Sequence, residues 1–263
     1  MNKQDKHFIQ IKQMYPLATS ICKPKIAGLV HDIYIVENIN SEKFICRFSD
    51  KKTAEHNIYA SKLLKKYDIK VPDISLYQFD NVFCETYKYI EGTTLHEKIL
   101  NQQISVPQIY TVFKQLIDIS IKISDIPMAD LHRITLPNKH FDWVSSFFQF
   151  FKQMQPVLCH TDLNAKNVVL DENNNVIALL DLDAITPSHF NTVFSRLCLC
   201  AKQYGIFDNK LFEIYPEKYK FGTSLWNTKA QISLYSLIVI TYAKLNQRTL
   251  FFKQCLEKQK SGI

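Results

Sequence analysis

The chain has 263 residues, of which 46% are hydrophobic and 13% aromatic, which is enough for one large domain or two lobes with a buried core. Its 32 basic and 25 acidic residues give a formal net charge of +7, but the lysines are dispersed, so nucleic-acid binding is not expected and a polycationic substrate is mildly disfavoured. The most apolar run is too short for a membrane span, and the polar N-terminus has no signal-peptide core.

The seven cysteines indicate a reducing compartment. They include no Cys-x-x-Cys pair, and the histidines show no metal-ligand spacing. Five of the seven cysteines lie within apolar runs: Cys46, Cys84, Cys159, Cys198 and Cys200. We therefore expect reduced, mostly buried thiols in a cytoplasmic protein.

The pattern over residues 21–48 predicts three strands. In the last of them Phe44, Cys46 and Phe48 share one face, and Arg47 lies on the other. A cation inside an apolar strand needs a partner, unless the strand is at an edge and the side chain faces water. Both possibilities remain open for Arg47 at this point.

A helix is expected next, over residues 53–67, with Asp50 or Thr53 as its N-cap. Glu55 is its only acidic residue, and so the only candidate within this helix to pair with Arg47. A glutamate in the first turn also favours the helix dipole wherever it points, which is the alternative explanation for Glu55.

The second half of the chain has a mainly helical pattern. Apolar residues at helical spacing predict a core-facing helix over 107–123. Further helices are expected at 142–154, 191–204 and 228–245. The predicted fold class is therefore α+β, with an N-terminal antiparallel sheet and one helix in residues 1–90 and a mainly helical C-terminal lobe in residues 91–263.

The most informative stretch is 159–167, which reads Cys-His-Thr-Asp-Leu-Asn-Ala-Lys-Asn. Two short apolar runs follow it, separated by Asp-Glu-Asn-Asn-Asn at 171–175, a strong turn signal. A hairpin folded about Asn174 brings Asn167 opposite Asp181, and cross-strand partners lie roughly 5 Å apart at their Cβ atoms.

This spacing suits phosphoryl transfer. An amide and a carboxylate at one end of a hairpin can share a magnesium ion, which prefers oxygen ligands from protein, phosphate and water. Asp162, five residues before Asn167, has the placement of a base that accepts a hydroxyl proton. Any one of these residues could be a solvated group near a turn, but their joint pattern favours a phosphotransfer site.

The block His-Thr-Asp-Leu-Asn-Ala-Lys-Asn, followed by Leu-Leu-Asp-Leu-Asp, resembles the aminoglycoside phosphotransferase and choline kinase family, whose members are small-molecule kinases with a protein-kinase-like fold. Protein kinases share the spacing of the aspartate, the asparagine and the metal-binding aspartate. They differ in having Arg where this chain has Thr161, Lys where it has Asn164, and Phe-Gly where it has Leu182 and Asp183.

The resemblance implies a two-lobed kinase-like fold with ATP between the lobes. It implies that Asp162 is the catalytic base and that His160 braces the catalytic loop rather than transferring protons. Asn167 and Asp181 would hold Mg²⁺, and Asp183 would assist or shape that site.

The resemblance also assigns nucleotide contacts in the N-terminal lobe. Arg47, held by Glu55, would reach the phosphates; most of the family has Lys at this place, and the choline kinase branch has Arg. Backbone groups around Tyr87 and Tyr89 would meet the adenine. Gly28 is the only glycine in the expected phosphate loop, where the family usually has two, so ATP binding there would be looser or the loop differently shaped.

The implied function is ATP- and Mg²⁺-dependent transfer of a phosphoryl group to a hydroxyl of a small molecule. The acceptor could be a choline- or ethanolamine-like amino alcohol, a sugar, a nucleoside or an aminoglycoside. A choline-like acceptor needs an aromatic cage, for which the candidates are Trp143, Tyr204, Tyr215, Tyr219, Trp226 and Tyr235. An inactive nucleotide-binding kinase-like protein and a protein kinase are the alternatives, and the sequence does not indicate the oligomeric state.

Overall fold

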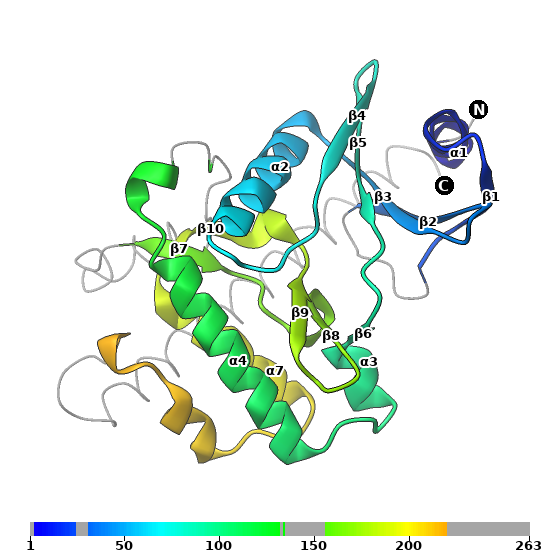
Figure 1. Cartoon of the computed structure of the whole chain (residues 1–263). Coiled ribbons are helices and arrows are strands. Elements are labelled where there is room, and N and C mark those ends of the chain that lie inside the picture. Colours follow the sequence, from blue (N-terminus) through cyan, green and yellow to red (C-terminus); the bar gives the residue numbers. More distant parts are fainter. Residues whose placement is uncertain (1–2, 25–30, 132–133, 135–155, 220–263) are drawn as a thin grey trace, which may run out of the picture.

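The computed structural model describes residues 3–24, 31–131, 134 and 156–219, and all structural statements concern these residues. An antiparallel sheet with two helices forms the N-terminal part, and helices with short strands form the C-terminal part (Figure 1). The predicted α+β architecture of two lobes is therefore confirmed, but the N-terminal part has two helices where one was expected, the additional helix spanning Lys3–Met14. The expected helices at 142–154 and 228–245, together with Trp143, Trp226 and Tyr235, lie outside the described residues.

The N-terminal sheet has five strands in the order β1-β2-β3-β5-β4, and each adjacent pair is antiparallel. The helices of this lobe are α1 and α2. The bounds of these elements are α1 Lys3–Met14, β1 Ala18–Cys22, β2 Asp32–Asn38, β3 Lys43–Ser49, α2 Lys51–Lys66, β4 Ser75–Phe79 and β5 Val82–Lys88.

The two faces of β3 differ as the alternation predicts. Cys46 and Phe48 are buried in a small core that also includes Ile11 of α1, and Phe44 packs against it. Arg47 is also buried, although it lies on the other face of the strand. Arg47 is therefore not an edge residue facing water, and it needs charged partners inside the protein.

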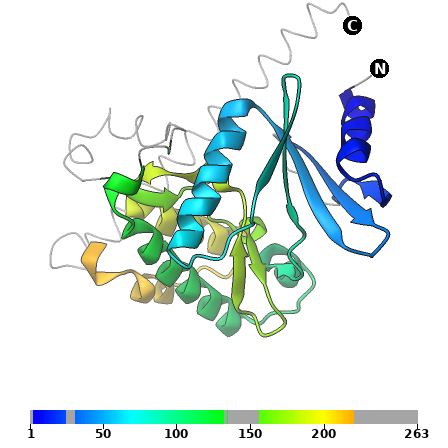
Figure 2. The ribbon, with the colours of Figure 1, turned by 45° about the horizontal axis from the view of Figure 1, so that its top comes forward.

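Helix α2 begins at Lys51, and Asp50 caps it. The Asp50 carboxylate accepts hydrogen bonds from the Thr53 amide at 3.0 Å and the Thr53 hydroxyl at 2.7 Å. Ala60 and Leu64 of α2 are fully buried in the larger of two cores, which is mostly built from the C-terminal part. In both views α2 accordingly lies at the boundary between the two parts (Figures 1 and 2).

The larger core gathers the apolar faces of α4 and α7 around short strands, and the predicted stripe on the helix at 107–123 is buried as expected. The C-terminal elements include a three-stranded sheet in the order β6-β8-β9 and the pair β10-β7. Their bounds are β6 Thr93–Thr94, α3 Leu95–Leu100, α4 Val106–Ser124, η1 Met128–Leu131, β7 Val157–His160, η2 Ala165–Asn167, β8 Val168–Leu170, β9 Val176–Leu179, η3 Leu182–Ala184, β10 Ile185–Ser188, α7 Phe190–Gln203, η4 Asn209–Ile214 and η5 Glu217–Tyr219.

The described cysteines are all free thiols, and the five that lie in apolar runs are buried, as predicted. Cys22 is exposed. In the described part of the chain, no helix has the length and apolar character required of a membrane span.

Candidate active site

The hairpin of β8 and β9 carries Asn167 and Asp181 of the candidate site at its open end. Asn174 has a φ of 64°, a left-handed conformation that asparagine tolerates, so the predicted turn is confirmed. Lys98 of α3 secures this turn by donating hydrogen bonds of 2.6 Å to both the Asp171 carbonyl and the Asn174 side chain. The hairpin is thus fixed at the end away from Asn167 and Asp181.

The register of the hairpin differs from the prediction by one residue. The Leu180 amide donates to the Asn167 carbonyl at 2.9 Å, so Leu180 faces Asn167, and Asp181 is the next residue. The turn is centred one residue earlier than predicted, with Asp171 paired to Asn175, and this alone would place Asn167 opposite Leu179. An irregularity between Val169 and Leu170 moves the pairing back by one residue, to Leu180. Asp181 has a φ of 63° and still lies at the same end of the hairpin as Asn167.

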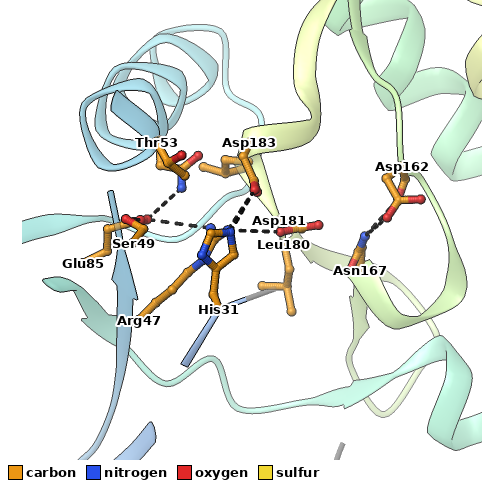
Figure 3. A network of polar contacts seen from close by, with 12 residues as sticks. His31, Arg47, Ser49, Thr53, Glu85, Asp162, Asn167, Leu180, Asp181 and Asp183 are labelled. Carbon is orange, nitrogen blue, oxygen red and sulfur yellow. Dashed lines mark hydrogen bonds and ion pairs between the residues drawn. The ribbon is translucent and has the colours of Figure 1, made fainter. Parts of the chain in front are cut away.

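Asp162 lies in the loop between β7 and η2, beside Asn167 (Figure 3). The Asn167 Nδ2 donates to the Asp162 carbonyl at 2.9 Å and approaches its Oδ2 at 3.4 Å. The loop is held in place because the amide and hydroxyl of Thr161 both donate to the Ala184 carbonyl, at 2.8 and 3.0 Å. The catalytic loop and the Asp181–Asp183 segment therefore form one unit.

His160 is fully buried directly before this loop. Its Nε2 donates to the Leu180 carbonyl at 2.8 Å, and burial lowers its pKa, so the ring is neutral. These contacts tie the catalytic loop to the end of β9. They agree with a bracing role for His160 and offer it no route to a substrate proton.

Arg47 is the centre of a cluster of acidic groups (Figure 3). Its Nη2 donates to Asp183 Oδ2 at 2.9 Å and lies 3.6 Å from Asp181 Oδ1. Its Nη1 lies 3.8 Å from Glu85 Oε2. Arg47 thus joins the N-terminal sheet to the carboxylates of the C-terminal part.

The predicted pairing of Arg47 with Glu55 is wrong. The side chain of Glu55 is 61% exposed and lies 3.8 Å from Lys51, one turn back on the same helix. Glu85 takes the expected place from strand β5, where it is the direct cross-strand partner of Arg47. Its signal in the sequence was an acidic residue inside the apolar run of a predicted strand.

Glu85 is fully buried and well supported. Its carboxylate accepts hydrogen bonds from Ser49 Oγ at 2.6 Å and from Asn57 Nδ2 of α2 at 2.8 Å. Burial raises the pKa of Glu85, while Arg47 and these two donors oppose the rise. Helix α2 therefore supports Arg47 indirectly: the Asn57 side-chain amide of α2 donates to Glu85, and Glu85 pairs with Arg47.

The charges of Asp181 and Asp183 are strongly coupled. Burial and the neighbouring Asp183 raise the pKa of Asp181, although 40% of its side chain is exposed. Burial opposes ionisation of Asp183 too, but His31, whose Nε2 lies 3.5 Å from Asp183 Oδ2, and Arg47 hold its pKa well below the usual range. Arg47 and His31 both contact Asp183, whereas Asp181 is approached only by Arg47, at 3.6 Å, so the two carboxylates are not fully neutralised by the described cations.

A divalent cation fits this pair. Asp183 Oδ1 is buried and has no hydrogen-bond partner among the described residues. The Asn167 amide nitrogen faces Asp162, which leaves its Oδ1 for another ligand. The described residues contain no group of three or more His, Cys, Asp or Glu side chains able to hold a metal ion alone, so an ion here would need Asn167 and non-protein oxygens as further ligands.

The remaining predicted nucleotide contacts are placed only in part. Tyr87 is half-buried on β5, opposite Ile45, and the Tyr89 amide already donates to the Lys43 carbonyl at 2.8 Å. Gly28 lies outside the described residues. Gly92, just after the predicted hinge, is packed so closely on β8 that an added Cβ would lie 2.7 Å from the Leu170 carbonyl oxygen.

A cavity of about 220 Å³ opens beside Asp162. The catalytic loop supplies one wall, with Lys166, and α7 supplies the other, with Arg196. Arg196 lies 3.4 Å from Asp162 and was missed by the sequence analysis. Its signal was the one arginine of α7, with apolar residues close by on either side, but only tertiary packing shows what it contacts.

The described aromatic residues do not form a cage. Tyr215 is buried and hydrogen-bonded to Asn191, and Tyr219 stacks on Phe190 with 4.0 Å between ring centroids. Tyr204 alone of the three described candidates lines the cavity, and its hydroxyl is engaged with His96 at 2.5 Å.

The lobes, the catalytic loop and the hairpin together define a kinase-like fold, and comparison with solved structures confirms it. Similar structures include the GDP and kanamycin complex of APH(2")-IIia, with a TM-score of 0.69, 12% identity and coverage of 98% of this chain and 99% of that one. Macrolide 2'-phosphotransferase type I gives a TM-score of 0.64 at 13% identity, covering 94% and 93%. Amicoumacin kinase hAmiN, in complex with AMP-PNP and Ca²⁺, gives a TM-score of 0.59 at 10% identity, with coverage of 80% of this chain and 72% of that one.

Identities this low establish a shared fold and leave the activity of this chain to be argued from its own residues. Neither family models nor curated proteins give a match to the sequence. The predicted resemblance to aminoglycoside phosphotransferases is therefore confirmed at the level of the fold.

Proposed function

We propose that this protein transfers the γ-phosphoryl group of ATP, with Mg²⁺, to a hydroxyl group of a small molecule. The observation that carries the proposal is the convergence of Asp162, Asn167, Asp181 and Asp183 at one end of the β8–β9 hairpin, facing Arg47 (Figure 3). Proteins of the same fold are named as complexes with GDP and with AMP-PNP, which supports a nucleotide site and leaves the choice between ATP and GTP to experiment.

Asn167, Asp181 and Asp183 would hold the magnesium ion through their side-chain oxygens. The bound ion would neutralise charge on the phosphates and so favour attack on the γ-phosphorus. Arg47, oriented by Glu85 and Asp183, is placed to direct its guanidinium toward the same phosphates. Preorganised charges of this kind act without reorganisation cost during the reaction.

Asp162 would accept the proton of the acceptor hydroxyl as its oxygen attacks. The new bond joins the acceptor oxygen to the γ-phosphorus, and the bond from that phosphorus to the bridging oxygen breaks, releasing the nucleoside diphosphate. The Asp162 side chain is 38% exposed, which leaves its carboxylate accessible to an acceptor. His160 and Thr161 keep the loop in position through the Leu180 and Ala184 carbonyls.

The nucleotide part of the proposal is tested by thermal unfolding with ATP and GTP, with and without Mg²⁺. We expect either nucleotide to raise the Tm in a Mg²⁺-dependent way, because a ligand at about 100 times its Kd stabilises the folded state by about 2.7 kcal/mol. Asp181→Ala should weaken the Mg²⁺-dependent part of the shift. Asp118→Ala, which removes an exposed carboxylate of α4, is the matched control and should leave it unchanged.

An absence of stabilisation by both nucleotides would contradict the proposal. Stabilisation without phosphoryl transfer to any hydroxyl compound would instead favour an inactive nucleotide-binding protein. An ATP- and GTP-consumption screen over amino alcohols, sugars, nucleosides, hydroxy acids and aminoglycosides separates the two outcomes.

A further inference from the structure

The cavity beside Asp162 has an unusual balance of charge. Its charged lining residues are one anion, Asp162, and two cations, Lys166 on the same loop as Asp162 and Arg196 on the opposite wall. Because Asp162 is the expected base, an acceptor hydroxyl must lie in or next to this cavity. The two cations are therefore neighbours of the acceptor.

Arg196 is held at the cavity by a hydrogen bond to the loop that carries Asp162. It projects from α7, its side chain is 25% exposed, and its Nε donates to the Thr161 carbonyl at 3.1 Å. Its Nη2 lies 3.4 Å from Asp162 Oδ1, which is longer than the roughly 2.7–2.9 Å of a strong charged hydrogen bond. Asp162 thus satisfies Arg196 only weakly.

A brace for the catalytic loop would need only the bond to Thr161. A guanidinium has five N–H donors in a planar fork that matches a carboxylate, and the described residues engage two of them. Lys166 adds a second positive charge at the cavity, on an exposed side chain. The excess of donors and of positive charge faces the space that the acceptor must occupy.

We propose that the acceptor is a hydroxy acid, whose carboxylate binds Arg196 with help from Lys166 while its hydroxyl meets Asp162. This inference rests on the proposed phosphotransferase function and specifies its substrate class. The acceptor carboxylate replaces Asp162 as the partner of Arg196, which frees Asp162 to take the hydroxyl proton. A polycationic acceptor would place like charges beside both cations.

The test uses matched acceptors that share a hydroxyl skeleton and differ in charge. Glycerate, glycerol and 3-amino-1,2-propanediol form one set, and glucuronate, glucose and glucosamine form another. Kanamycin serves as a polycationic acceptor, and glycerol 3-phosphate separates preference for a carboxylate from preference for any anion. Phosphorylation is measured as kcat/KM, and binding as the shift in Tm with Mg·AMP-PNP present.

We expect the carboxylates to exceed their neutral and cationic counterparts by at least tenfold. Arg196→Gln should reduce the ratio of carboxylate to neutral kcat/KM by about 10- to 100-fold, as expected for loss of a hydrogen bond between charged groups. The ratio is the informative quantity, because a disturbance of Asp162 by the substitution would lower kcat/KM for carboxylate and neutral acceptors alike and leave their ratio unchanged. Lys166→Gln should lower the ratio several-fold.

Lys202→Gln is the matched control, since Lys202 is an exposed cation of the same helix that does not line the cavity. It should leave the ratio unchanged. Equal or better use of neutral or cationic acceptors, or no binding and no phosphorylation of any carboxylate, overturns the inference. Mg²⁺-dependent nucleotide stabilisation together with either result would leave the phosphotransferase proposal standing.

Discussion

At the scale of single residues, the buried charge of Arg47 organises the acidic groups around it. Arg47 was predicted to need a partner, and helix α2 offers only Glu55. The structure instead pairs Arg47 with Glu85, because the register of β3 and β5 places the two directly opposite each other on a buried face. Register between strands distant in sequence is set by packing and cannot be obtained from spacing within one helix.

The two glutamates make a matched pair for mutation. We expect Glu85→Ala to lower the free energy of unfolding by about 3 kcal/mol or more, since it removes one partner of a buried ion pair and leaves Arg47, Ser49 and Asn57 with fewer contacts. It should also weaken nucleotide binding. Glu55→Ala should change stability by about 0.5 kcal/mol at most, because Glu55 is exposed.

Urea unfolding and nucleotide titration of both variants measure these effects. Similar losses of stability for the two variants would mean that Glu85 does not hold Arg47 as the structure indicates.

The positions of the proposed catalytic and metal-binding residues were better predicted than their surroundings. Asp162, Asn167 and Asp181 are close in sequence and joined by a turn with strong local signals, so spacing alone brought them together. Arg196 reaches Asp162 from a different helix, and nothing local in the sequence shows that contact. The one-residue difference at Leu180 is local: the turn pairs Asp171 with Asn175, and the irregularity between Val169 and Leu170 offsets only one of the two residues by which that pairing departs from the prediction.

At the scale of elements, α7 begins in a way that makes its stability depend on pH. His189 is its N-cap, and its Nδ1 accepts a hydrogen bond from the Asn191 amide at 3.2 Å. Burial lowers the pKa of His189 to about 4. The neutral ring therefore both caps the helix and fits its buried surroundings, and a protonated ring can do neither.

The sign of the effect follows from the lowered pKa. The unfolded chain binds the proton near pH 6.5 and the folded chain only near pH 4, so the contribution of His189 is complete above pH 6.5 and is lost as the pH falls toward 4. Between pH 7.5 and 5.5, wild type should lose about 1 kcal/mol more stability than His189→Asn, which can cap without titrating.

His189→Ala is the companion variant. It should show the same reduced pH dependence as His189→Asn but lower stability at every pH, by about 1 kcal/mol, because it has no capping group. Chemical unfolding across this pH range measures both effects. A pH dependence identical to that of wild type in both variants would contradict the assignment.

At the scale of the whole molecule, the sheet and the helices form two cores, and α2 of the N-terminal lobe contributes to the larger one. The small core lies between α1 and the sheet, and the larger core takes in Ala60 and Leu64 of α2 together with the C-terminal helices. The general layout was predictable, since alternation indicated the sheet and helical periodicity indicated α4 and α7. The place of α2 in the larger core was not, because its apolar face does not specify which core it joins. The division at residue 90 stays a prediction.

Asp162 is the proposed base of the phosphoryl transfer, and the whole mechanism depends on this role. The most direct test is the rate of acceptor phosphorylation by Asp162→Ala, relative to wild type, under saturating Mg²⁺ and nucleotide. We predict a loss of about 10²–10⁴-fold, the usual contribution of a general base, with nucleotide affinity largely retained. Transfer at the wild-type rate by Asp162→Ala would contradict the account.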